Sequence, residues 1–287
     1  DGLSHGDKRC VWRAPRRGPL SRNIWAPELA WIDGFTAAAA SARGHWYVYF
    51  AADDGRNKNH RMYALQSAGE EALGPYVCKG KIAAPGEDRW AIDGTVIDLE
   101  EPLGGGRKLY FLWSGWEGKY NGMQKLYIAA MRDPWTLAGP RIEISRPDQI
   151  WERRSGPSPC YVNEGPAAIV RNGRVIVAYS ANGFWSDEYC LGLLSCDMRN
   201  VLDPAAWEKD RGPAFCKSDD LFGVGHNCFV QVHDGPEAGW WNIYHGTRRP
   251  NMRGKAREIF AQPFTWQANT PVLGRPVRPD VGVALWR

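Results

Sequence analysis

Four features typical of other protein classes are lacking from this 287-residue sequence. No apolar run approaches the roughly 18 residues of a membrane-spanning helix, so we expect no transmembrane segment, and no signal peptide is visible. The basic residues are dispersed, and the densest short run, at residues 13–17, is interrupted by Ala14 and Pro15. This charge pattern does not indicate a nucleic-acid partner. Helix signals are nearly absent as well.

Cysteine is scarce and occurs in the odd number of seven, so at least one thiol is unpaired or pairs between chains. Cys190 and Cys196 are predicted to lie on one strand, where a rise of about 3.3 Å per residue places them roughly 20 Å apart, too far to bridge. No CxxC pair suggests zinc. Cysteine usage therefore does not indicate a cellular compartment.

Aromatic residues, by contrast, are abundant, with 15 Trp, 11 Tyr and 9 Phe. Two explanations fit this abundance. Large aromatic side chains fill hydrophobic cores, and a flat indole also matches the apolar face of a sugar ring. Composition alone does not separate core packing from sugar binding.

Four segments share one layout, in which a strand rich in aromatic and β-branched residues is followed by a loop and a second strand. Corresponding positions recur about every 65 residues, a length that suits a four-stranded propeller blade with long loops. A β-sandwich with accidental spacing is the alternative. The paired strands are expected at residues 45–50 and 61–65, 108–113 and 125–129, 174–179 and 189–194, and 240–244 and 257–261.

A short motif with a polar residue precedes each pair of strands. The four motifs are residues 25–28 (WAPE), 92–95 (IDGT), 163–166 (NEGP) and 225–227 (GHN). The first strand of a propeller blade lines the central channel, so we expect Glu28, Asp93, Glu164 and His226 to converge on one axis. Acids gathered in a pocket cost free energy to desolvate unless they are paired or functional, which indicates a site.

These motifs, with others in the same order, resemble glycoside hydrolase family 43, and within it the α-L-arabinofuranosidases and other arabinan-degrading members. The resemblance extends from about residue 2 to the end of the chain. It is carried by residues 23–28, 91–95, 112–116, 133–137, 162–166, 189–193 and 223–227.

The resemblance implies a five-bladed β-propeller and an inverting hydrolysis. It assigns Glu164 as the general acid and Asp93 as the residue that tunes the pKa of that acid. Inversion requires a protonated carboxyl for the leaving oxygen and an ionised one, about 6.5–9.5 Å away, to activate water. His226 matches a histidine that helps to hold an axial metal, often calcium, partly through water. Arg257 matches an arginine near the active site.

The general base of the family is absent from its expected position. It is an Asp on the first strand of the first blade, some 50 residues before the WAPE motif, whereas only 24 residues precede Trp25 here. We therefore expect an all-β propeller over residues 1–287, a single domain whose first blade is incomplete at the N-terminus. An incomplete gene and a natural variant both explain this. Either way, we expect poor activity, and exposed strand edges there favour a dimer.

Sugar contacts are expected from aromatic residues in or beside the inner-strand motifs, with blade packing as the alternative for each. The predicted substrate-binding residues are Trp25, Trp113, Phe184 and Tyr189, together with Arg257. Glu28 is expected to be structural or at the pocket edge, and His245 structural. Asp53, Asp54 and Asp98 are interpreted as loop acids.

The sequence thus predicts a glycosidase that removes terminal α-L-arabinofuranosyl units from arabinan or arabinoxylan. Two alternatives remain: an endo-arabinanase or β-xylosidase on the same fold, and an inactive propeller that only binds polysaccharide. The substrate class implies a secreted protein that meets plant cell-wall polysaccharide. No organic cofactor is indicated.

Overall fold

The computed structural model describes residues 8–34, 44–100, 106–155 and 160–278. Within these ranges the protein is all-β, with four short 3₁₀ helices and no α-helix. The 3₁₀ helices are η1 (Asn57–Asn59), η3 (Ile150–Arg153), η4 (Met198–Asn200) and η5 (Pro204–Ala206). No helix in this part of the chain is long and apolar enough to cross a membrane.

The chain divides into two compact units, each with its own cores. Among the described residues, the N-terminal unit takes in those of 8–122 and 126–144, and the C-terminal unit those of 123–125 and of 145–278.

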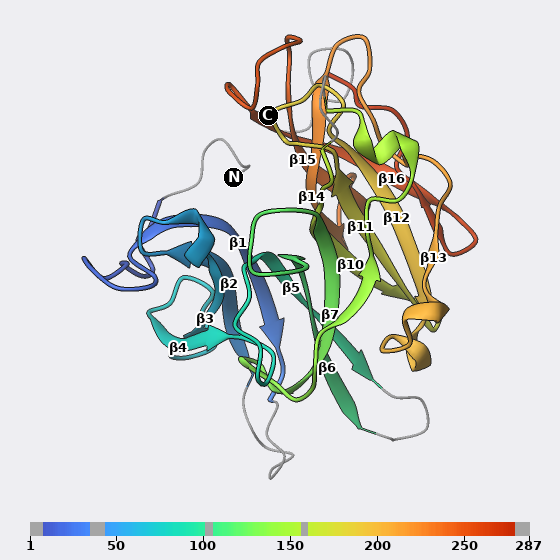
Figure 1. The fold of residues 1–287 in the computed structure, drawn as a ribbon. Coiled ribbons are helices and arrows are strands. Elements are labelled where there is room, and N and C mark those ends of the chain that lie inside the picture. Colours follow the sequence, from blue (N-terminus) through green and yellow to red (C-terminus); the bar gives the residue numbers. More distant parts are fainter. Residues whose placement is uncertain (1–7, 35–43, 101–105, 156–159, 279–287) are drawn as a thin grey trace. The chain divides into compact units, whose positions relative to one another are not determined.

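The strands form four antiparallel sheets that follow the chain in order, as in successive propeller blades (Figure 1). The first sheet contains β1 (Arg22–Ile32), β2 (His45–Asp53), β3 (Arg61–Ser67) and β4 (Tyr76–Ile82). The second contains β5 (Ala91–Glu100), β6 (Arg107–Trp116), β7 (Gln124–Asp133), β8 (Thr136–Leu137) and β9 (Ile142–Ser145), with β9 pairing with β7.

The third sheet contains β10 (Asn163–Arg171), β11 (Arg174–Ala181), β12 (Cys190–Asp197) and β13 (Glu208–Lys209). The fourth contains β14 (Phe222–Val232), β15 (Gly239–Thr247), β16 (Glu258–Gln267) and β17 (Thr270–Val272). All four predicted strand pairs are confirmed, and neighbouring strands are consecutive in sequence. The predicted count of five blades is not confirmed, because the described strands make four.

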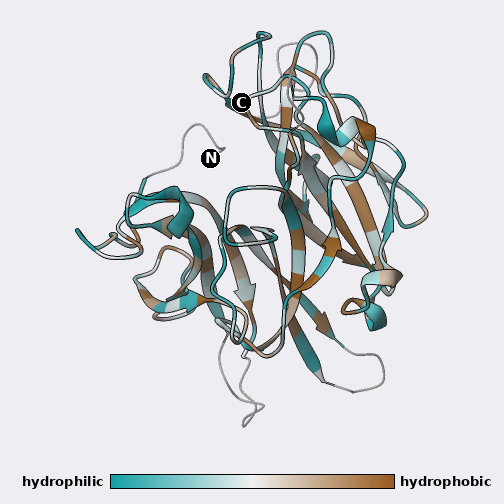
Figure 2. Ribbon diagram, viewed as in Figure 1, coloured by the Kyte–Doolittle hydropathy of each residue, from teal (hydrophilic) through white to brown (hydrophobic). Residues whose placement is uncertain are grey.

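Hydrophobic residues concentrate on the strands, whereas the loops are mainly hydrophilic (Figure 2). The main core of the N-terminal unit includes Tyr49, Phe111 and Trp113, each at most 5% exposed. That of the C-terminal unit includes Phe215 and Tyr244. The abundance of aromatic residues is thus explained in large part by core packing.

The first strand of every sheet is irregular at its polar motif. Its pairing with the second strand shifts register there, as in a β-bulge, and one residue at or beside the motif adopts a left-handed backbone conformation. The shifts lie between Trp25 and Glu28, Ile92 and Thr95, Glu164 and Ala167, and Gly225 and Cys228. The left-handed residues are Ala26, Asp93, Gly165 and His226. The motif that repeats in the sequence therefore corresponds to a bulge that repeats in the first strand of each sheet, with one polar side chain at each bulge.

Candidate active site

Glu164 lies near the start of β10 and is only 7% exposed. The hydroxyl of Tyr189, itself completely buried, donates a 2.8 Å hydrogen bond to Oε1 of Glu164. Gly165 follows with a φ of 54°, and a Cβ at this position would approach Cγ of His226 to 3.0 Å. Glycine is therefore required beside the acid for both backbone and packing reasons.

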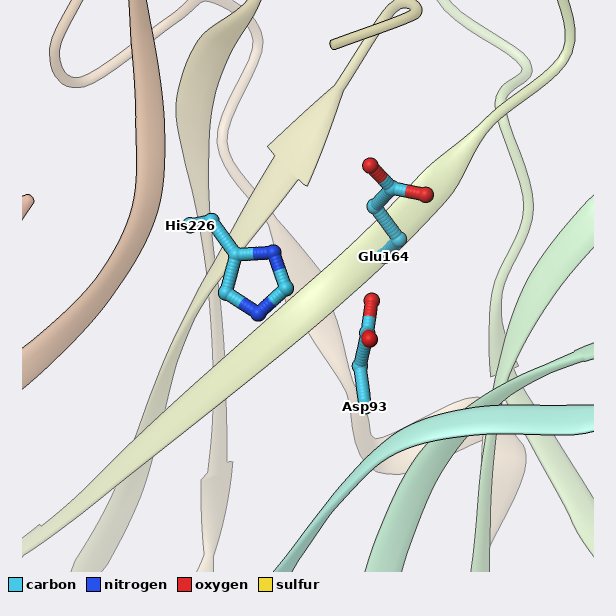
Figure 3. Close-up of side chains that lie close together, drawn as sticks. All are labelled: Asp93, Glu164 and His226. Carbon is cyan, nitrogen blue, oxygen red and sulfur yellow. The ribbon is translucent and has the colours of Figure 1, made fainter. Parts of the chain in front are cut away.

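His226 reaches the same region of the C-terminal unit from β14. Glu164 and His226 point into a shared space (Figure 3), and a ring nitrogen of His226 lies within 4.8 Å of a carboxylate oxygen of Glu164. The backbone N–H of His226 donates a 2.8 Å hydrogen bond to Oγ of Ser180, the residue opposite Glu164 on β11. Ser180 thus couples the positions of the two motifs.

His245 on β15 packs against Tyr189, the residue that holds Glu164. Its ring stacks on Tyr189 with centroids 5.5 Å apart and an interplanar angle of 5°. Arg257 Nη1 lies 3.3 Å from Nε2 of His245, and since arginine only donates, that nitrogen is the acceptor. Burial, followed by the nearby His226 and Arg257, lowers the pKa of His245 to about 3. A neutral imidazole therefore lies against Tyr189 across the ordinary pH range.

Nδ1 of His245 is buried and has no hydrogen-bond partner among the described residues. From the sequence, His245 follows a strand and could reach the pocket, but a structural role was preferred; its stacking on Tyr189 was not predicted. No motif around His245 signals the contact, because Tyr189 and Arg257 directly precede two other strands, β12 and β16.

Asp93 lies in the N-terminal unit, on β5, and its side chain is drawn in Figure 3. It is 7% exposed and has a φ of 55°. The adjacent Gly94 packs closely, since a Cβ there would come within 2.2 Å of the Phe111 ring. The motif thus presents a buried carboxyl from a strained, tightly packed bulge.

Glu28 lies on β1 in the same unit and is partly exposed. Burial raises the pKa of its carboxyl to about 7. At neutral pH this side chain is therefore a mixture of protonated and ionised forms. Its role, like those of Glu164 and Asp93, stays a prediction.

The predicted sugar-binding aromatics fall into two groups. Trp25 and Phe184 are 39% and 41% exposed, and Arg257 lies over the Phe184 ring, 4.9 Å from its centroid. Trp113 and Tyr189 are only 5% and 0% exposed. The first group can present a face to a ligand, whereas the second is placed for packing and, in Tyr189, for holding Glu164.

The interpretation of Asp53 and Asp98 as loop acids is wrong. Asp53 ends β2 and is completely buried, 3.0 Å from Nδ1 of an equally buried His60. Asp98 lies within β5 and pairs with Arg107. Each acid pairs with a basic side chain of another segment, Asp53 with His60 and Asp98 with Arg107. The pattern of a single sequence does not show such pairs. Asp54 is exposed and accepts from Asn59, as a loop acid does.

Known proteins resemble this chain over most of its length. An α-L-arabinofuranosidase 43 of Humicola insolens is 32% identical over 97% of this chain and 55% of its own length. An extracellular exo-α-(1→5)-L-arabinofuranosidase of Streptomyces chartreusis is 34% identical over 82% of this chain and 66% of its own. The chain thus spans about half to two thirds of these curated relatives.

A solved structure of an α-L-arabinofuranosidase from Lactobacillus brevis superposes with a TM-score of 0.78 at 32% identity, covering 94% of this chain and 82% of that one. The family model described as glycosyl hydrolases family 43 matches residues 2–271. With these matches, the chain belongs to glycoside hydrolase family 43.

Proposed function

We propose that this protein hydrolyses terminal α-L-arabinofuranosyl units of arabinan or arabinoxylan with inversion at the anomeric carbon. The observation that carries the proposal is Glu164, a buried carboxyl with one oxygen held by the Tyr189 hydroxyl, inside a chain that matches family 43. The names of the curated relatives support arabinofuranosidase action rather than the endo-arabinanase, β-xylosidase or binding-only alternatives.

In this mechanism Glu164 gives its proton to the departing glycosidic oxygen. Asp93 is assigned, as in the family, to tuning the pKa of Glu164, since a negative charge beside a carboxyl favours its protonated form. Water attacks the anomeric carbon from the opposite face and loses a proton to a general base. The C–O bond to the aglycone breaks as the new C–O bond forms, which inverts the configuration.

The contacts with the sugar are proposed for Trp25, Phe184 and Arg257, whose side chains retain exposure or a free face. Trp113 is assigned to the core and Tyr189 to holding Glu164. We further propose that the two units belong to one five-bladed propeller domain that is secreted, as relatives described as extracellular are. Dimerisation through the N-terminal edge stays a prediction.

Calcium at the axis, held by His226 partly through water, stays a prediction. Calcium takes about six to eight oxygen ligands, whereas His226 offers nitrogen and Glu164 is assigned to proton transfer. Water would have to supply most of the shell. No step of the mechanism is therefore assigned to a metal.

The test is hydrolysis of an aryl α-L-arabinofuranoside by the wild type, E164Q and D93N, with product configuration followed by NMR. We expect E164Q to lose most activity on a poor leaving group and far less on a leaving group that needs no proton. Equal losses on both substrates would contradict the general-acid role. Added azide, which can replace a water that needs a base, should yield β-arabinofuranosyl azide wherever the base is limiting.

A β product from wild type would confirm inversion, and an α product would exclude it. Linear arabinan separates the alternatives: free arabinose indicates exo action, and oligomers indicate endo action. Binding of arabinan without turnover, with or without azide, would identify the binding-only alternative.

A further inference from the structure

Trp25 is presented by an unusually distorted stretch of β1. The pairing with β2 shifts register on both sides of Trp25, and the residues at 23 and 26 are left-handed, with φ values of 48° for Asn23 and 37° for Ala26. Such a backbone conformation is unfavourable outside glycine and persists only where the surroundings enforce it. The distortion leaves the Trp25 side chain 39% exposed on the strand.

The inner face of Trp25 lies on a buried imidazole. The Trp25 and His60 rings stack with centroids 3.9 Å apart and an interplanar angle of 26°. Trp90 contacts His60 edge-on from another direction, with centroids 6.4 Å apart. The His60 side chain is completely buried, so it forms a floor beneath the partly exposed indole.

Both ring nitrogens of His60 face acceptors. Nδ1 lies 3.0 Å from Oδ2 of Asp53 and 3.2 Å from the carbonyl oxygen of Asn57, and Nε2 lies 3.0 Å from the carbonyl oxygen of Asn23. A carbonyl oxygen can only accept, and so can an ionised carboxylate. In this geometry both ring nitrogens are placed to donate, and His60 and Asp53 lie as a buried ion pair.

The same ion pair holds the distorted backbone before Trp25. Nδ2 of Asn23 donates to both carboxylate oxygens of Asp53, at 3.0 and 3.1 Å, while the Asn23 carbonyl accepts from His60. The backbone N–H of Gly55 adds a 2.7 Å hydrogen bond to Asp53 Oδ1. Asn23, the left-handed residue, is thus clamped at both its side chain and its backbone.

Stability alone is a poor explanation for this arrangement. A buried ion pair often contributes no more than apolar residues of the same volume, because the desolvation cost offsets the attraction. Here the pair holds the distorted backbone of β1 at Asn23, and its His60 ring packs against one face of the Trp25 indole. Preorganising a contact surface in this way lowers the entropy lost when a ligand binds.

We propose that the Asp53–His60 ion pair is a positioning device that holds Trp25 as a rigid platform on which the apolar face of an arabinofuranosyl ring stacks. The inference rests on the proposed function for the identity of the sugar. The ion pair itself does not touch the sugar, since both side chains are completely buried. It acts through Trp25.

The first test needs no ligand. Nitrogen-15 NMR of the full chain should show both nitrogens of His60 protonated, and D53N should remove a proton from one of them. The carbon-bound protons of His60 should show an upfield ring-current shift that disappears in W25A. A His60 with one unprotonated nitrogen in the wild type would overturn the ion pair.

The second test measures binding of α-1,5-L-arabinotriose by calorimetry in an E164Q background, which keeps the ligand intact. We expect W25A to weaken binding about tenfold, the worth of one aromatic contact. H60Q should weaken it by a similar factor. The double variant W25A/H60Q should bind within about twofold of W25A alone, because coupled residues are non-additive.

W31A is the matched control, since Trp31 lies on the same strand and is 37% exposed. It should bind the triose within about twofold of the parent. Thermal unfolding of each variant separates loss of fold from loss of the platform, and D53N provides a second variant of the pair that keeps the shape of Asp53.

The outcomes distinguish the two proposals. If the NMR signatures hold and the parent binds xylotriose but not arabinotriose, the arabinose assignment of the proposed function is wrong and the platform serves another pentose. If the parent binds arabinotriose and H60Q or D53N binds equally well while folded, the positioning role is overturned. Additive losses in W25A/H60Q would overturn it as well.

Discussion

Glu28 illustrates how burial changes the behaviour of a single acid. Its pKa is raised from 4.5 to about 7 by burial. A carboxyl with a raised folded-state pKa resists ionisation, so it destabilises the fold increasingly as pH rises from 4.5 to 7 and fully above 7. Below pH 4.5 the carboxyl is protonated in both states and contributes no such cost.

We therefore expect E28Q to raise the free energy of unfolding by about 2 kcal/mol at pH 8 and to change it little at pH 4. Urea unfolding at the two pH values measures this difference. E100Q, at an exposed glutamate at the end of β5, should stay within about 0.5 kcal/mol of wild type at both. A gain by E28Q that is equal at both pH values would contradict the burial argument.

Tyr189 is the described residue whose hydroxyl holds the proposed general acid. We expect Y189F to lower kcat on an aryl arabinofuranoside about tenfold. Glu164 becomes a carboxylate as its proton leaves, and a hydrogen bond to a charged group contributes about 1.5–3 kcal/mol. Initial rates measure this effect.

Y244F is the control, because Tyr244 is also buried in the C-terminal unit and its hydroxyl donates to Gln262, away from Glu164. It should lose stability without a comparable loss of kcat. Similar losses of kcat in Y189F and Y244F would contradict a specific role of the Tyr189 hydroxyl and would indicate that Tyr189 contributes through packing alone.

At the scale of elements, a buried ionic network fixes η3 and β13 to the start of β10. Glu152 is completely buried and accepts hydrogen bonds from Asn163, Tyr179 and Lys209. Asn163 directly precedes Glu164, and Oδ1 of Asn163 also accepts a hydrogen bond from Oγ of Ser145. The network therefore determines where the strand that carries the acid begins.

We expect K209M to lower the free energy of unfolding of the protein by about 3 kcal/mol, because it leaves the Glu152 charge buried without its cation. K217M is the matched control, since Lys217 pairs with Glu188 at a more exposed site, with side chains 42% and 34% exposed. Its loss should stay below about 1 kcal/mol. Urea unfolding compares the two, and equal losses would show that Lys209 is not needed to compensate the buried charge.

The repeated bulge is the element that connects sequence to site. Each polar motif could be found in the sequence because it recurs at one place in a repeating unit and because strand patterns are local. The left-handed residues within the motifs were not predicted. Ala26 is a residue that rarely adopts this conformation, and Asp93 and His226, although of types enriched among the exceptions, adopt it too seldom for the sequence to predict it.

At the scale of the whole molecule, the fold is held without disulfides. The seven cysteines all lie among the described residues and none is in a disulfide; Cys10, Cys78 and Cys216 are exposed. Cys190 and Cys196 lie on β12, as predicted, and both are buried. The hydrophobic cores and the sheet hydrogen bonds therefore account for the stability of the fold without covalent cross-links.

A reducing agent should accordingly leave the midpoint of thermal unfolding unchanged. Ellman's reagent should react first with the three exposed cysteines of the native protein and with all seven after denaturation. A lower midpoint in dithiothreitol, or fewer than seven reactive thiols in denaturant, would contradict the free-thiol assignment.

The sequence by itself determined the strand order, the repeat and the residues at the four motifs, because alternation, turn signals and repeat spacing are properties of neighbouring residues. Only the tertiary structure decided which side chains are buried and with whom they pair. From the sequence Asp53 was interpreted as a loop acid, whereas in the structure it ends β2 and pairs with the buried His60. Trp113 was predicted to contact the sugar, whereas it is buried in the hydrophobic core. Burial and pairing depend on contacts between different segments of the chain, and those contacts set the hydrogen-bond partners of His60 and the exposure of Trp25.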